Sequence, residues 1–134
     1  MKDRILIVED NVAFREMLEF YLSKTHDVKT AENGLDAILQ LQNGYMPDLI
    51  VSNYVMPIID GKTMVLQIKE SVLFRHIPVI IMSNINISNV RLDLIKAGVS
   101  DFLVKPISLT ELELSIKRLL KVAKDESKLF SKLN

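Results

Sequence analysis

Residues that could bind a cation and a phosphoryl group follow four separate apolar runs of the sequence. Glu9 and Asp10 end the first of these runs, Asn53 ends the second, Ser83 the third and Lys105 the last. Two adjacent carboxylates facing an amide oxygen form the oxygen-rich kind of pocket that binds Mg²⁺. A lysine and a hydroxyl opposite them would suit the oxygens of a phosphoryl group. If the fold brings the run ends together, we expect a pocket where a divalent cation and a phosphoryl group can meet.

A sheet must position these residues. Five short runs are predicted as strands, at residues 4–8, 28–31, 49–53, 79–82 and 101–104. Apolar residues follow one another at 49–51 instead of alternating, which is typical of a parallel strand buried on both faces. Helical periodicity begins near residues 12, 35, 61, 88 and 109. The alternation of strands and helices predicts a parallel sheet with helices on both faces and its strand ends at one edge.

The composition limits the possible classes of function. The chain has 134 residues, 49% of them hydrophobic and 25% charged, with a net charge of +0 and no cysteine. This length suits one domain, and the lack of cysteine excludes disulfides, thiolate metal sites and a cysteine nucleophile. The balanced charge does not favour nucleic acid, and no apolar run approaches the ~20 residues of a membrane span. We expect a cytoplasmic protein, because the first strand begins at Arg4 and leaves no room for a signal peptide.

Several short motifs occur in a fixed order along the chain. They are Val8-Glu9-Asp10-Asn11, Pro47-Asp48-Leu49-Ile50-Val51-Ser52, Met56-Pro57 with Asp60-Gly61, Met82-Ser83, Ala97-Gly98 and Lys105-Pro106. Together, from residue 2 to about residue 122, they resemble the receiver domain of bacterial two-component response regulators. The resemblance implies a flavodoxin-like, doubly wound α/β fold, with a five-stranded parallel sheet in the order 2-1-3-4-5 and five helices. We expect a receiver domain at 1–122, followed at 123–134 by a helical extension or a frayed tail.

The resemblance implies a role for each residue of the pocket. Glu9 and Asp10 are expected to hold Mg²⁺, directly or through water, with Asn53 and the backbone carbonyl of Val55 as further ligands. Position 53 itself is the phosphoacceptor position of the family.

Three other residues receive roles from the same resemblance. Ser83 and Lys105 are expected to contact the phosphoryl group, and the Lys105–Pro106 peptide bond is expected to be cis. Phe102 falls at an aromatic switch position, which couples the site to the surface formed by the fourth helix, fifth strand and fifth helix. Without the resemblance, Phe102 would be interpreted as ordinary core packing.

Asn53 departs from the family pattern, which has an aspartate at this position. An acyl phosphate requires a carboxylate nucleophile, and an amide offers no anionic oxygen. The pocket also loses one negative charge, which lowers its affinity for Mg²⁺. In exchange, the Asn53 amide is able to donate a hydrogen bond to Asp10.

The leading hypothesis is a signalling module, not an enzyme: a receiver domain that cannot be phosphorylated at Asn53 and acts through protein contacts, that is, a pseudo-receiver. The partners implied are a sensor histidine kinase or phosphotransfer protein, and a downstream protein bound by the face of the fourth helix, fifth strand and fifth helix. We expect no direct contact with nucleic acid or membrane, and a monomer or weak homodimer.

Three alternatives remain open at this point. The chain could be an ordinary phospho-accepting receiver that carries an engineered Asp-to-Asn substitution. The change could also be tolerated in a protein whose Mg²⁺ site serves another use. A Mg²⁺-dependent phosphohydrolase is the rival class, but enzymes of that kind with an aspartyl nucleophile carry a second Asp two residues after the first, and Asp10 is followed by Asn11 and Val12.

Overall fold

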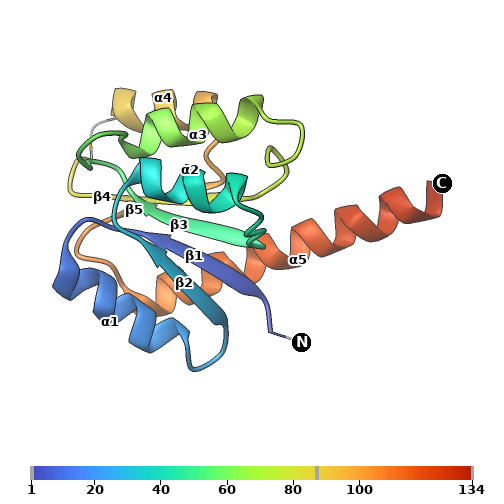
Figure 1. Cartoon of the computed structure of the whole chain (residues 1–134), viewed down its shortest axis with the longest axis horizontal. Helices are drawn as coiled ribbons and strands as arrows, with labels where there is room; N and C mark the ends of the chain where they lie inside the picture. The colour runs from blue at the N-terminus through green and yellow to red at the C-terminus, as the bar shows by residue number, and fades with distance from the viewer. Residues whose placement is uncertain (1, 87, 134) are drawn as a thin grey trace.

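A five-stranded parallel sheet forms the centre of the computed structural model, which describes residues 2–86 and 88–133 (Figure 1). Its strands are β1 (Arg4–Val8), β2 (Asp27–Ala31), β3 (Leu49–Asn53), β4 (Val79–Ser83) and β5 (Asp101–Val104). They lie in the order β2-β1-β3-β4-β5, and every neighbouring pair is parallel. The flavodoxin-like α/β fold and the strand order expected from the sequence are confirmed.

Five helices alternate with the strands. They are α1 (Val12–Leu22), α2 (Gly34–Gln42), α3 (Gly61–Glu70), α4 (Ser88–Ala97) and α5 (Leu109–Leu133). Helices α1 and α5 cover one face of the sheet, and α2, α3 and α4 cover the other (Figure 1). Because both faces are covered, the central strands are apolar at nearly every position, as their sequences predicted.

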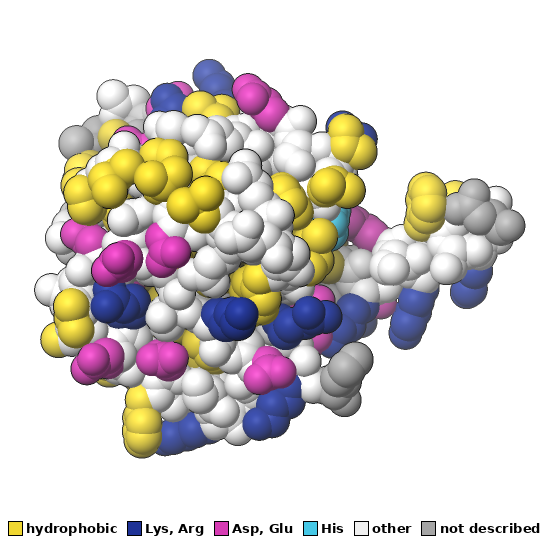
Figure 2. Space-filling view, viewed as in Figure 1, with side chains coloured by type: hydrophobic (Ala, Val, Ile, Leu, Met, Phe, Trp, Pro, Cys, Tyr) yellow, Lys and Arg dark blue, Asp and Glu magenta, His cyan; other side chains and the backbone are white. Residues whose placement is uncertain are grey.

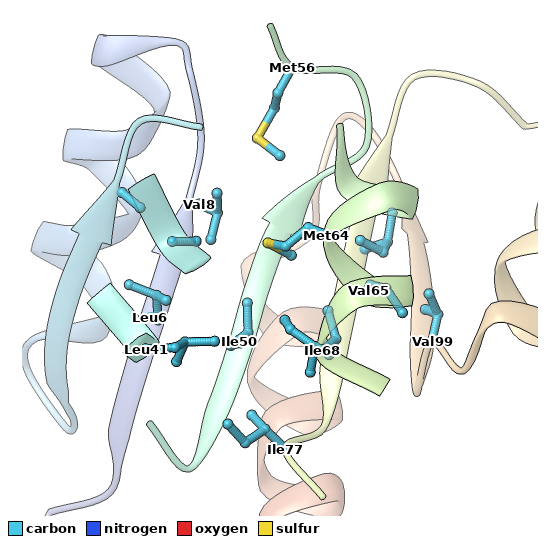
Figure 3. Packing of buried hydrophobic residues seen from close by; sticks show 14 of the residues in the cluster. Leu6, Val8, Leu41, Ile50, Met56, Met64, Val65, Ile68, Ile77 and Val99 are labelled. Carbon is cyan, nitrogen blue, oxygen red and sulfur yellow. The ribbon is translucent and has the colours of Figure 1, made fainter. Parts of the chain in front are cut away.

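Alternate residues of each strand contribute to two separate cores. In β1, Ile5 and Ile7 pack against α1 and α5, whereas Leu6 and Val8 pack against the helices of the other face. All four are fully buried. Figure 3 shows the second of these cores, in which Leu6, Val8 and Ile50 of the sheet meet side chains of α2 and α3. Burying a side chain of this size contributes roughly 1.5–3 kcal/mol, so these cores hold the strand ends in place.

Polar side chains fix where three of the helices begin. Asn11, Asn33 and Asp60 cap α1, α2 and α3, and each accepts a hydrogen bond from the backbone N–H three residues further on, at 2.9, 2.8 and 2.8 Å. Such caps satisfy donors that the helix itself leaves without a partner. Because α1 begins directly after its cap, Glu9 and Asp10 are held in a short connection at the end of β1.

Helix α5 is longer than the sheet that it covers. It runs for 25 residues, and its buried side chains end at Leu120. Beyond that residue the helix projects from the domain, past the end of the sheet where the strands begin (Figure 1). Lys124 anchors the base of the projection, because its Nζ lies 3.1 Å from Oδ2 of Asp3. Across residues 2–86 and 88–133, none of the helices combines the length and the apolar character needed to cross a membrane.

Candidate functional site

The polar residues singled out from the sequence lie at the carboxyl ends of adjacent strands. Val8 pairs with Ser52, so Glu9 leaves β1 beside the end of β3, where Asn53 is the last residue. Ser83 ends β4 next to β5, and Lys105 follows β5. The parallel arrangement therefore brings Glu9, Asp10, Asn53, Ser83 and Lys105 to one edge of the sheet, where open α/β sheets build their sites.

Glu9 and Lys105 form a partly buried ion pair at this edge. The Glu9 side chain is fully buried, and its Oε1 lies 3.1 Å from Nζ of Lys105. Its other oxygen accepts a hydrogen bond from the Asn11 backbone N–H at 3.2 Å. The Lys105 ammonium also lies 4.6 Å from the centre of the Phe14 ring, within cation–π range. These contacts fix the lysine so that it points into the site.

The two carboxylates of the site have opposite pKa shifts. Burial, reinforced by the neighbouring Asp10, raises the pKa of Glu9 above its ordinary value despite the Asn11 hydrogen bond and Lys105. Burial also pushes the pKa of Asp10 upward, but hydrogen bonds with Glu9 and Asn53 outweigh that effect, so the pKa of Asp10 lies below its ordinary value. Glu9 is thus the member of the pair that takes up a proton more readily.

The side-chain amide nitrogen of Asn53 donates hydrogen bonds to two oxygen atoms of the site. Nδ2 of Asn53 donates to Oδ1 of Asp10 at 3.2 Å and to the backbone carbonyl of Val55 at 2.8 Å. The bond to Asp10 confirms the expectation from the sequence, and the bond to Val55 was not expected. One NH₂ group therefore satisfies two of the oxygens that the resemblance assigned to Mg²⁺.

The donor set fits Mg²⁺ in chemistry but not in the present orientation of Asn53. Asp10, Val55 and the Asn53 amide carry the hard oxygen atoms that Mg²⁺ prefers. However, the NH₂ group of Asn53, which carries a partial positive charge, faces the oxygens of the other two. Across the part of the chain that the structure describes, no group of three or more His, Cys, Asp or Glu side chains is placed to hold a metal ion. Cation binding would require rotation of the Asn53 amide, so that its carbonyl oxygen turns inward.

Ser83 lies at the edge of the sheet that carries the site, whereas Phe102 lies within the core. Ser83 is 1% exposed, and its hydroxyl accepts a hydrogen bond from the Ile85 backbone N–H at 2.9 Å, which holds the turn after β4. The Phe102 ring is buried in the core under α2, α3 and α4. The peptide bond between Lys105 and Pro106 is cis, which confirms the expectation.

Two residues shape the site in ways that were not predicted from the sequence. Arg15 of α1 donates from Nη1 to the Glu9 backbone carbonyl at 2.8 Å, so it clamps the end of β1 onto α1. Gly61 is buried at the start of α3, where a Cβ atom would lie only 2.6 Å from the Asn53 carbonyl oxygen. Within the Asp60-Gly61 motif, Asp60 caps α3 and Gly61 permits a close approach between α3 and β3.

Comparison with known proteins identifies the family. The sequence model described as "Response regulator receiver domain" matches residues 5–117 of this chain. The chain belongs to this family. Receiver domains are signalling modules that interact with histidine kinases or phosphotransfer proteins, and they typically bind Mg²⁺.

Individual receiver domains resemble this chain in sequence and in structure. It is 36% identical over 124 residues to the sensor histidine kinase TmoS of Ectopseudomonas mendocina, covering 91% of this chain and 13% of the kinase. It is 32% identical over 141 residues to the two-component response regulator ARR7 of Arabidopsis thaliana, covering 97% of this chain and 68% of that regulator. The crystal structure of the signal receiver domain of a putative Luxo repressor protein from Vibrio parahaemolyticus has a TM-score of 0.87 at 28% identity, covering 96% and 98% of the two chains.

The chain matches only a segment of several curated relatives. It covers 13%, 8% and 9% of three histidine kinases, so the similarity is to a receiver segment within much longer proteins. What those proteins do as wholes is therefore a separate matter from what this receiver domain does.

The receiver domain should not tolerate a side chain at Gly61. We expect Gly61→Ala to lower the free energy of unfolding by about 1–3 kcal/mol, because the added methyl group overlaps the Asn53 carbonyl and forces α3 away from β3. Urea unfolding followed by circular dichroism measures this loss. Gly44→Ala is the control for glycine replacement, since no atom lies within 4 Å of a Cβ there, and any cost arises only from its positive φ of 102°. Equal stability of Gly61→Ala and the wild type would show that α3 is not held at this distance.

Opposite pH dependences are expected from the two carboxylates. Because the folded pKa of Glu9 is raised, the folded state binds its proton more readily than the unfolded state, and stability falls as pH rises through that pKa. Glu9→Gln should remove this fall, so the variant gains stability relative to the wild type as pH rises above about 4.5.

Asp10→Asn is the matched control for this measurement. The folded pKa of Asp10 is lowered, so its contribution is present above the ordinary value and is lost as pH falls through the folded pKa. Urea unfolding at a series of pH values between 3 and 7, chosen to bracket both groups, should give differences of opposite sign for the two variants. The same sign for both would contradict the assignment of the proton to Glu9.

Proposed function

We propose that this receiver domain signals through protein contacts without forming an acyl phosphate at position 53. The observation that carries the proposal is the position of the Asn53 amide, whose nitrogen donates to Asp10 and to the Val55 carbonyl. The family resemblance assigns position 53 to the phosphoacceptor. An amide at that position has no carboxylate to attack a phosphoryl group, and its NH₂ group is already engaged in the pocket. The domain is in this sense a pseudo-receiver, not an enzyme.

Two of the remaining site residues are proposed to recognise a phosphoryl group. Lys105 points into the site, and Ser83 lies at the end of β4, so both are proposed as phosphoryl-contact residues. Phe102, buried beneath α4, is proposed as the switch residue. An incoming sensor histidine kinase or phosphotransfer protein would therefore meet a surface of the usual shape that does not accept its phosphoryl group.

Mg²⁺ binding is proposed to be weak. Asp10, the Val55 carbonyl and, after rotation of its amide, Asn53 would hold the cation, with Glu9 behind them. Rotation breaks the hydrogen bonds to Asp10 and Val55, and the site lacks the third carboxylate that would compensate for this loss. The cation would neutralise negative charge at this edge of the sheet.

The proposed output surface is the face formed by α4, β5 and α5. Apolar side chains are exposed there on all three elements, Leu92 and Ile95 on α4, Val104 on β5 and Leu114 on α5. This face belongs to the proposed receiver unit, residues 1–122, with the helical extension at 123–134 outside it. We further propose a cytoplasmic location, with no direct contact with nucleic acid or membrane.

Treatment of the wild-type chain with acetyl phosphate and Mg²⁺ tests the chemical part of the proposal. Intact mass spectrometry should show no addition of a phosphoryl group, and an addition at position 53 would overturn the proposal. Photo-crosslinking from Leu92 tests the output face, with Val72, which is exposed in the connection between α3 and β4 and outside that face, as the control. Partners captured only through Val72 would contradict its assignment.

An ordinary phospho-accepting receiver with an Asp-to-Asn substitution is the second candidate. The observation in its favour is that the Glu9–Lys105 pair, Ser83 and the cis Lys105–Pro106 bond all remain in place around Asn53. A domain that never meets a phosphoryl group has no need of these residues. Restored phosphorylation in the Asn53→Asp variant, together with a partner that binds only the phosphorylated form, would favour this candidate.

A further inference from the structure

The charges of this chain are divided between two segments. Residues 30–61 contain four acidic side chains and no Lys, Arg or His, which gives a net charge of −4. Residues 117–133 contain six Lys or Arg and two acidic side chains, which gives a net charge of +4. The net charge of +0 is therefore the sum over a chain that contains two oppositely charged regions. Opposite potentials on two surfaces favour association of those surfaces.

The acidic segment carries an exposed apolar surface, which we call the α2 patch. It consists of Leu35 and Leu39 on α2, Val55 and Ile58 on the loop after β3, and the acidic side chains Glu32 and Asp36. The two elements adjoin, because a Cβ atom at Gly34 would lie 2.6 Å from the carbonyl oxygen of Ile59. Figure 2 shows a group of hydrophobic side chains on this side of the molecule with acidic side chains beside it.

Ile58 is the unusual member of the α2 patch. It has a positive φ of 71°, in the left-handed region that a β-branched residue rarely adopts, and its side chain is 74% exposed. The positive φ belongs to a tight turn, which a hydrogen bond from the Ile59 N–H to the Pro57 carbonyl closes at 2.9 Å. Ile59 packs against the core, whereas the Ile58 side chain does not. A strained backbone that presents a large apolar side chain to solvent is typical of a surface that binds something.

The basic segment is the C-terminal half of α5, residues 117–133, and it has two adjoining faces. Lys121, Lys124, Lys128 and Lys132 recur at spacings of three and four residues and form a basic stripe. Val122, Leu129 and Leu133, which are 46%, 61% and 77% exposed, form an apolar stripe beside it. The part beyond Leu120 projects for about 20 Å, enough to lie along a helix such as α2.

The two surfaces cannot meet within one molecule. The α2 patch lies at the edge of the sheet where the strands end, next to Asn53. The C-terminal half of α5 leaves from the opposite edge, where Lys124 pairs with Asp3 just before β1 (Figure 1). Because the helix is continuous, it leads away from its own α2 patch. A second molecule can bring the two surfaces together.

We propose that the C-terminal half of α5 docks on the α2 patch of a second copy of this chain. The apolar stripe covers Leu35, Leu39 and Ile58 of the second copy, and the lysines approach Glu32 and Asp36. The contact is head-to-tail, since each copy offers two different surfaces. This association is separate from the proposed output face on α4, β5 and α5, and it does not depend on phosphorylation.

Sedimentation equilibrium of the full chain over a range of concentrations tests the proposal. The wild type should associate, and the association should weaken as salt is added, since it pairs opposite charges. The tail variant Lys128→Glu/Lys132→Glu and the patch variant Glu32→Lys/Leu39→Lys should each associate at least ~10-fold more weakly. The control Arg91→Glu/Lys96→Glu makes the same charge change as the tail variant on α4, and it should associate as the wild type does.

Mixing the two defective variants distinguishes head-to-tail docking from pairing of like surfaces. The patch variant retains a native tail, and the tail variant retains a native α2 patch, so an equal mixture should form a heterodimer that grows no further. If the tails pair with one another, or the patches do, one variant will still associate with itself, and the mixture will contain no heterodimer. A mixture without a heterodimer, or loss of association in only one of the two variants, overturns the proposal.

Ile58→Gly separates the role of this residue in binding from any role in folding. Glycine adopts a positive φ without strain, so the variant should unfold at a higher temperature than the wild type and yet associate more weakly. Loss of both stability and association would mean that Ile58 only supports the fold. A wild-type chain that remains monomeric up to about 1 mM would also overturn the proposal.

Discussion

The Asn53→Asp variant is expected to gain one phosphoryl group from acetyl phosphate in the presence of Mg²⁺, whereas the wild-type chain gains none. The substitution provides the carboxylate that forms an acyl phosphate, at a position in contact with Asp10 and at the same edge of the sheet as the Glu9–Lys105 pair. Intact mass spectrometry distinguishes the two chains. The difference should be all or none, since the amide offers no anionic nucleophile at any concentration of phosphodonor.

Two further variants make this experiment specific to the pocket. Asn53→Ala removes the amide without providing a nucleophile and should remain unmodified. Asn53→Asp combined with Lys105→Met retains the nucleophile but loses the cation proposed to contact the phosphoryl group, so it should be modified much more slowly. Modification of Asn53→Ala at the same rate as Asn53→Asp would show that the phosphoryl group goes to another residue.

Asn53→Asp is also expected to destabilise the metal-free domain by about 2–4 kcal/mol. The change removes the hydrogen bonds to Asp10 and to the Val55 carbonyl, and it places a third carboxylate beside Glu9 and Asp10. Saturating Mg²⁺ should recover most of the loss, because the cation binds the folded state of the variant. Urea unfolding in EDTA and in Mg²⁺ measures both effects.

The wild type and Asn53→Ala serve as controls for this second prediction. The wild type should gain little stability from Mg²⁺, because its Asn53 amide already donates hydrogen bonds to the Asp10 and Val55 oxygens that the cation would bind. Asn53→Ala loses the same hydrogen bonds without adding charge, so it should be destabilised by only about 1–2 kcal/mol. If Asn53→Asp has the stability and the Mg²⁺ response of the wild type, the hydrogen bonds of the Asn53 amide do not stabilise the metal-free domain.

These predictions rest on features that the sequence and the structure revealed to different extents. The strand at 49–53 and its neighbours were predictable, because buried parallel strands are short continuous apolar runs that end in polar residues. The order 2-1-3-4-5 was implied by the family resemblance and is confirmed by the pairing of β1 with both β2 and β3. The Asn53–Asp10 hydrogen bond was predictable from the residue types once the two strand ends were placed side by side.

Other contacts depended on distances that no local pattern encodes. The bond from Asn53 to the Val55 carbonyl requires the loop after β3 to turn back on itself, and nothing in the residue types specifies that path. Arg15 reaches the Glu9 carbonyl because α1 packs at a particular height over β1. The role of Gly61 likewise follows from a separation of 2.6 Å between a Cβ position and the Asn53 carbonyl, which exists only in the folded chain.

Residue type and local periodicity are enough to indicate the alternating α/β elements, the set of polar residues at the strand ends and the amide at position 53. Three features are visible only in the folded chain: the direction of the Asn53 amide, the exposure and positive φ of Ile58, and the projection of α5 away from the α2 patch. Hydrogen-bond direction, backbone strain and surface exposure result from packing between elements far apart in the chain. For that reason the residues of the pocket could be recognised in the sequence, whereas the two hydrogen bonds that the Asn53 amide donates within it could be seen only in the fold.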